Sequence, residues 1–424
     1  MTRMSSARRL AMAAGMGVAI PAVAITSHGH HATAAASFGT PVVVGTGAAE
    51  PGIHVAPDGT TIYIEGPAGL LSNLPGSPSP IWRSDNDGSS WIRTPASLRA
   101  NLPGGGDSTL AIDPATGNLS FADLWLGSST VSTSTDKGQS WQAQPLGGLP
   151  VQDRQWLAST PGGNAYLAYH QIPAGIIVNK SVDGGLVYPL SSVAATPVDQ
   201  TGCICPPGNV IAEGGTMPGT NDKVGVIFAT STNGVKFARA TDGATTFSVA
   251  SVASGSAPTD SAFPVVANAG GGNLVATWLE NDGSKTSRVG VARSADWGAT
   301  WTGRQYLPLG GANVYPWVAA SGQHVVISLY HSSTTGSPDT VPASATWNES
   351  FVESIDGGQT FSGLVTVDPT PVKSGPICTG GTNCSGNREL LDFQSVALDG
   401  AGKAVVAYAR VASGGVDVMF ARES

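Results

Sequence analysis

Short apolar segments alternate with turn-forming residues along most of the chain, and this pattern predicts β-strands joined by tight turns. One unit is typical: an apolar run at 261–267, a Gly- and Asn-rich turn at 268–273, and a second apolar run at 274–279. Comparable units occur near residues 53, 109, 155, 208, 263, 316 and 393. We interpret each as a β-hairpin, so the chain is predicted to be all-β with seven such hairpins.

A second pattern, Ser/Thr-x-Asp-x-Gly-x-Thr/Ser-aromatic, recurs between these hairpins. Its six copies, which we call the octapeptide turns, begin at residues 84, 134, 181, 240, 294 and 354. The residues at their third position are Asn86, Asp136, Asp183, Asp242, Asp296 and Asp356. An Asp or Asn side chain accepts backbone N–H groups of its own turn, and Gly adopts backbone angles that strain other residues. We therefore predict that the octapeptide turns are structural hairpin turns.

The octapeptide turns resemble the Asp-box, or bacterial neuraminidase, repeat of sialidase-like β-propellers. The resemblance covers nearly all of residues 37–424 and implies one propeller domain, because an inner hairpin and an octapeptide hairpin together make a four-stranded blade. Seven blades are predicted, with six as the alternative because the fourth repeat, 208–247, is the least regular. The last repeat ends near residue 422 without an octapeptide. We expect residues 38–44 to supply its fourth strand and close the ring.

The first 36 residues have the features of an export signal. Arg3, Arg8 and Arg9 precede an apolar run at 10–25, and small residues at 34–36 offer a cleavage site. The Sec route is expected, with twin-arginine export as the alternative. Because this segment holds three Arg and no acid, the remainder carries 18 basic and 29 acidic residues. Such a charge disfavours nucleic acid and anionic membranes as partners, and we expect a secreted monomer.

Four cysteines, Cys203, Cys205, Cys378 and Cys384, suit disulfides in an exported protein. Three connectivities are possible. A Cys378–Cys384 bond closing a Gly-rich loop is the first hypothesis, and cross-pairing of the two loops is the alternative. We expect no metal and no cofactor.

The predicted topology separates the two ends of the propeller. The octapeptide turns follow the third strand of a blade, so they lie opposite the start of the first strand. Candidate chemistry therefore belongs to first-strand starts, second-strand ends and their loops, which carry acids including Glu50, Asp107, Asp260 and Asp282. The catalytic candidates are Asp153, Arg154, Tyr330, His331, Arg388, Glu389 and Asp392, and the ligand-binding candidates are His170, Glu280, Tyr315 and Arg410. Arg154 and Arg388 lead this set, with pairing to acids of their own loops as the structural alternative.

Sialidases hold a substrate carboxylate with three arginines and use a Tyr nucleophile. Their first arginine lies in an Arg-Ile-Pro segment of the first blade, where this chain has Glu50-Pro51-Gly52-Ile53-His54. The departure favours a propeller that binds or cleaves glycans, by hydrolysis or elimination, without being a sialidase. A noncatalytic binding or scaffold propeller is the first alternative, and an exo-sialidase is the second.

Overall fold

A computed structural model describes residues 36–69, 76–98, 101–147, 151–202, 205–232, 234–254, 263–281 and 286–424. Residues 35–424 form one compact unit. The expected export signal lies, except for residue 36, outside the described residues. Within the described ranges, the structure contains no helix with the length and hydropathy needed to cross a membrane.

The unit consists of antiparallel β-sheets built from consecutive strands. Blade 1 holds β2 (Gly52–Val55), β3 (Ile62–Glu65), β4 (Ile81–Ser84) and β5 (Ile92–Arg93). Blade 2 holds β6 (Ser108–Ile112), β7 (Leu119–Trp125), β8 (Ser128–Ser134) and β9 (Gln142–Pro145). Blade 3 holds β10 (Gln152–Thr160), β11 (Asn164–Gln171), β12 (Gly175–Ser181) and β13 (Leu190–Ala195). Blade 4 holds β14 (Pro207–Glu213), β15 (Lys223–Ala229), β16 (Val235–Ala240) and β17 (Ser248–Ala253).

The remaining blades follow the same plan. Blade 5 holds β18 (Val265–Gly270), β19 (Asn273–Asn281), β20 (Ser287–Ser294) and β21 (Gln305–Tyr306). Blade 6 holds β22 (Ala312–Ser321), β23 (His324–Ser332), β24 (Thr346–Ser354) and β25 (Val365–Thr366), and β26 (Lys373–Ser374) also pairs with β24. A short 3-10 helix, η1 (Gly381–Asn383), precedes blade 7, which holds β27 (Ser395–Leu398), β28 (Ala404–Ala412), β29 (Gly415–Arg422) and β1 (Val42–Thr46).

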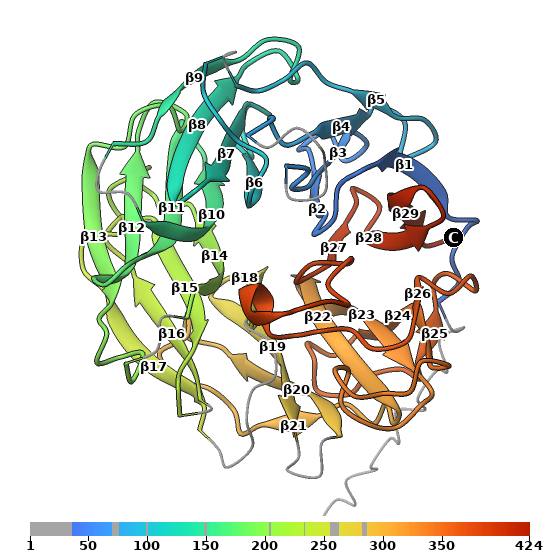
Figure 1. Cartoon of the computed structure of the whole chain (residues 1–424). Coiled ribbons are helices and arrows are strands. Elements are labelled where there is room, and N and C mark those ends of the chain that lie inside the picture. Colours follow the sequence, from blue (N-terminus) through green and yellow to red (C-terminus); the bar gives the residue numbers. More distant parts are fainter. Residues whose placement is uncertain are drawn as a thin grey trace, which may run out of the picture. The chain divides into compact units, whose positions relative to one another are not determined.

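The first strands of neighbouring blades contact one another around the whole ring, from β2 through β6, β10, β14, β18 and β22 to β27 and back to β2. Figure 1 shows the blades radiating from this inner ring. The prediction of seven blades is confirmed, and the six-blade alternative is wrong because 207–253 forms a complete four-stranded blade.

Closure by the N-terminal segment is also confirmed. Strand β1 pairs antiparallel with β29, with Val42 opposite Phe420 and Val43 opposite Met419. Phe38 adds an isolated bridge to Glu423. Because β1 occupies the outer edge of β29, that strand's backbone groups are paired and no open edge remains there.

Each octapeptide turn connects the third and fourth strands of a blade. In the second turn, the Ser134 hydroxyl bonds to Asp136 and accepts the Gly138 N–H at 2.9 Å. Asp136 Oδ1 also accepts the Ser140 N–H at 2.8 Å. This arrangement satisfies the turn's polar groups locally, which explains the residue types of the repeat.

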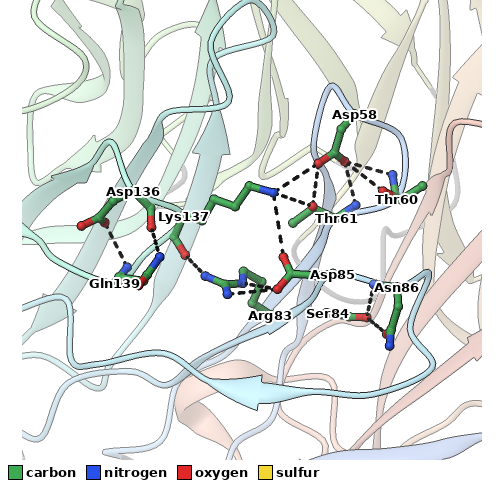
Figure 2. A network of polar contacts seen from close by, with 10 residues as sticks. All are labelled: Asp58, Thr60, Thr61, Arg83, Ser84, Asp85, Asn86, Asp136, Lys137 and Gln139. Atoms are coloured by element: carbon green, nitrogen blue, oxygen red, sulfur yellow. Dashed lines mark hydrogen bonds and ion pairs between the residues drawn. The ribbon is translucent and has the colours of Figure 1, made fainter.

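The octapeptide turns also join neighbouring blades, as Figure 2 shows for blades 1 and 2. Arg83 of β4 donates to the Lys137 carbonyl oxygen at 2.6 Å and pairs with Asp85 at 3.0 Å. The Lys137 ammonium lies 3.5 Å from Asp58. This end of the propeller is therefore bound together by structural contacts.

Four aromatic side chains meet across the centre of the ring. The ring centroids of Trp156 in β10 and Trp317 in β22 are 5.5 Å apart, although their blades are not neighbours. Phe393 lies within 5.3 Å of both, and Phe263 packs against Trp156 at 6.1 Å. This group fixes the inner strands relative to one another and supplies an apolar base for polar groups at the strand starts.

The predicted Cys378–Cys384 disulfide is confirmed, with an S–S distance of 2.09 Å. Cross-pairing of the two loops is therefore wrong. Cys205 is disulfide-bonded as well, while Cys203 lies outside the described residues.

Candidate functional site

Charged side chains converge at the end of the propeller where the first strands begin. Glu50, Asp107 and Asp392 precede β2, β6 and β27, respectively. Asp153 and Arg154 belong to β10, and Tyr315 belongs to β22. Together with Arg388, these residues interact through hydrogen bonds, ion pairs or longer-range charge effects. We call this set the axial cluster: Glu50, Asp107, Asp153, Arg154, Tyr315, Arg388 and Asp392.

Two β-bulges direct side chains of the axial cluster. The pairing of β10 with β11 shifts register between Asp153 and Trp156, and that of β22 with β23 shifts between Val314 and Trp317. Arg154 and Tyr315 lie within these irregularities and have φ angles of 41° and 54°. Left-handed angles are costly for such side chains, and bulges change where a side chain points. Backbone strain of this kind often marks a functional site.

Arg154 lies at the centre of the cluster and is 2% exposed. Its Nη1 is 3.7 Å from Glu50 Oε2 and 3.6 Å from Asp107 Oδ1, so acids of two other blades flank it. Its Nη2 donates to the Ser108 carbonyl oxygen at 3.3 Å. The guanidinium carbon lies 3.9 Å from the centroid of Trp156, a cation–π contact. Arg154 thus joins the charged cluster to the aromatic group beneath it.

Arg388 is paired within its own loop, as the structural alternative predicts. Its Nε donates to Asp392 Oδ1 at 3.1 Å, and its Nη2 contacts Oδ2. The Asp392 backbone N–H donates to Glu50 Oε1 at 2.9 Å. Glu50 therefore contacts Arg154 directly and Arg388 through Asp392, so both arginines lie in one cluster.

Burial changes the protonation of the acids in this cluster. It raises the pKa of Glu50 well above 4.5, and the nearby Asp392 charge raises it further. Burial also raises the pKa of Asp107, although Arg154 opposes the shift. The pKa of Asp153 rises to about 6, first through burial and then through repulsion from Asp107. Asp153 remains accessible to solvent, so one carboxyl at this site can hold or release a proton near neutral pH.

Three predicted residues are internally bonded elsewhere. Glu280 is 1% exposed, and its carboxylate accepts hydrogen bonds from Trp278, Arg304 and Tyr306. Tyr330 is buried, and its hydroxyl bonds to the backbone of Ala409 in blade 7. Glu389 pairs with Lys373 at 2.7 Å. These contacts are those of structural residues.

The other candidates also lie outside the axial cluster. His331 Nδ1 bonds to Asn313 at 2.9 Å, and Arg410 pairs with Asp417 and Asp368. His170 is cross-strand from Asp153, and burial lowers its pKa. Asp260 and Asp282 lie outside the described residues. Among the residues that are described, no group of three or more His, Cys, Asp or Glu is arranged to hold a metal ion.

Gln155 also belongs to this region, although its position in the sequence did not predict this. Its side chain is fully buried and donates to the Asp107 carbonyl oxygen at 2.6 Å. Its Oε1 has no hydrogen-bond partner within the described part of the chain. The sequence did offer one signal, because Asp153 to Gln155 are three consecutive polar residues at the start of a strand. In a regular strand, successive side chains point to opposite faces, so Arg154 and Gln155 could not both point inward without an irregularity.

No protein family model matches the chain, and no curated protein matches it significantly. Its fold is similar to a protein of unknown function from Dyadobacter fermentans DSM 18053, with 15% identity and a TM-score of 0.51 over 92% of this chain and 99% of that one. YCF48 bound to D1 peptide is 11% identical, with a TM-score of 0.51 over 91% and 94%. Phage phi92 endosialidase is 10% identical, with a TM-score of 0.51 over 92% and 69%. At these identities, the similarity concerns the β-propeller fold alone.

Proposed function

We propose that the chain is a secreted Asp-box propeller that binds and cleaves a glycan at the axial cluster. The main support is the convergence of strained, charged residues from several blades on one end of the ring axis. The export signal predicted at residues 1–36 and the disulfide support secretion. The fold is similar to that of an endosialidase, which supports the proposal by analogy alone.

The acids of the cluster suit general acid–base hydrolysis. Asp153, with a pKa near 6, is the proposed acid that protonates the leaving oxygen of the glycosidic bond. Asp107 is the proposed carboxylate partner, which activates water or attacks the sugar. It interacts electrostatically with Asp153, and Arg154 opposes the rise in the Asp107 pKa that burial causes. The proposed residues are thus two acids of differing environment, the arrangement used by most glycosidases.

The exo-sialidase alternative has less support because the described arginines of this cluster are already engaged by acids. Arg388 is occupied by Asp392, and Arg154 lies between Glu50 and Asp107. Tyr315 is an unsuitable nucleophile because burial raises its pKa well above 10. A noncatalytic propeller that binds a ligand without cleaving it is the alternative that experiment must distinguish from the proposed enzyme.

The test is a screen of the mature protein on a glycan panel, with binding and product release measured separately. Asp153→Asn is expected to lower turnover at least about 100-fold with little change in melting temperature. Asp87→Asn, in an octapeptide turn at the other end, is the matched control and should retain activity. Binding without any product would favour the noncatalytic alternative, and the absence of both would refute the proposal.

A further inference from the structure

The axial cluster contains more acids than arginines. Its four carboxyl groups belong to Glu50, Asp107, Asp153 and Asp392, whereas Arg154 and Arg388 supply its two guanidinium groups. Asp392 neutralises Arg388, and two acids share Arg154. Burial disfavours ionisation of these acids, so an added anion would hold them protonated, whereas an added cation would favour their charged form.

Unpartnered polar atoms adjoin these acids. Arg154 Nε and Nη1 have no hydrogen-bond partner within the described part of the chain, although the side chain is almost completely buried. The neighbouring Gln155 leaves its Oε1 acceptor unpartnered as well. Buried polar atoms are normally satisfied, so such atoms call for an explanation. A ligand bearing hydroxyl groups supplies both the acceptor for Arg154 and the donor for Gln155.

We propose that the axial cluster selects glycans that carry free amino groups, such as glucosamine oligomers, over neutral glycans, and discriminates against glycans that carry carboxylates. This inference rests on the proposed function, because it specifies the substrate class of the same site. The sugar hydroxyls would satisfy the unpartnered atoms of Arg154 and Gln155. The ammonium group would balance the excess of carboxylates, and its charge-assisted hydrogen bonds to them are among the stronger polar contacts.

A proton-linked signature follows from the same geometry. Glu50 faces Asp107, Arg154, Arg388 and Asp392, while Asp153 faces Asp107, Arg154 and Asp392. Burial and repulsion from Asp392 disfavour ionisation of Glu50, and a bound ammonium group would favour it. Binding of the protonated amino glycan should therefore release protons from the protein, and the affinity for this protonated form should increase as the pH rises from 5 to 6.5.

The experiment is calorimetric titration at pH 6.5 with three matched tetrasaccharides: a glucosamine oligomer, its N-acetylated form and a uronate oligomer. We expect the glucosamine oligomer to bind at least about tenfold more tightly than the N-acetylated form, and the uronate oligomer to bind most weakly. Raising the salt concentration should reduce the differences in affinity among the three tetrasaccharides, because salt screens the charge interactions. Repeating the titration in buffers of different ionisation enthalpy measures the released protons.

Asp153→Asn should reduce the preference for the amino glycan over its N-acetylated form, while the Asp87→Asn control retains it. Because Asp153 reaches solvent, this variant is expected to fold, unlike substitutions of Glu50 or Arg154. Uronate binding as tight as amino-glycan binding, or equal affinity for all three ligands, would overturn the inference but leave the proposed function standing. Failure to bind any glycan would overturn both.

Discussion

Replacement of Glu349 by Gln should stabilise the protein, and increasingly so as the pH rises. Glu349 lies in β24 opposite Tyr330 and is 0% exposed. Neither carboxylate oxygen has a hydrogen-bond partner within the described part of the chain. Burial raises its pKa well above 4.5, and repulsion from Asp368 adds to the shift. The folded protein therefore favours the neutral carboxyl, whereas the unfolded chain ionises at the ordinary pKa.

The sign of the pH effect follows from proton linkage. A raised folded-state pKa means that this group's contribution to stability is fully present below the unfolded pKa, near 4.3, and is lost as the pH rises through the folded pKa. The loss is about 1.4 kcal/mol for each pH unit between the two pKa values. Gln has nearly the same shape and does not ionise, so Glu349→Gln removes this loss.

The assay is urea unfolding of both proteins between pH 4 and pH 8. The free energies of unfolding of the two proteins should differ little near pH 4. Above that pH, the variant's free energy of unfolding should exceed that of the parent by about 1.4 kcal/mol more for each pH unit, up to the folded-state pKa of Glu349. Glu213→Gln is a control of opposite sign: burial opposes ionisation, but hydrogen bonds from Lys223 and Asn268 outweigh it and lower the Glu213 pKa. That variant should lose stability at neutral pH. A pH-independent difference, or a Glu349→Gln variant less stable at pH 8, would refute the reasoning.

Three further predictions concern the architecture. Gly88→Ala should lower the free energy of unfolding by about 2–4 kcal/mol, because φ is +81° and the added Cβ would lie 2.0 Å from the Phe420 ring. Gly47→Ala is the control: φ is +74° but the space around it is open, so urea unfolding should show a loss of only about 1 kcal/mol. Deleting residues 37–46 should lower the melting temperature and cause self-association in size-exclusion chromatography, because β29 loses its partner β1; an unchanged monomer would contradict this. The Ser140 hydroxyl and N–H hold the Asp136 pKa at about 2, so the stability from this turn should be lost as the pH falls from 4 towards 2, and Asp136→Asn should reduce that acid sensitivity in thermal melts.

The sequence by itself determined the all-β architecture, the positions of the octapeptide turns and the source of the closing strand, and it predicted seven blades with six as the alternative. These features depend on local physics. The octapeptide side chains bond to backbone groups only a few residues away, as Asp136 does with Ser140. Likewise, alternating apolar residues indicate a strand from local sequence alone. Because this strand-and-turn unit is repeated along the chain, the repeats predict a propeller.

Only the tertiary structure decided which charged residues meet. Glu50 accepts the backbone N–H of Asp392, 342 positions away in the chain, and Arg154 contacts acids from two other blades. The sequence pattern placed Glu280 and Tyr330 at the same end of the propeller, but packing between strands buried both. The physical reason is that propeller symmetry brings all first-strand starts to one end, while bulges and burial determine which of their side chains reach the axis.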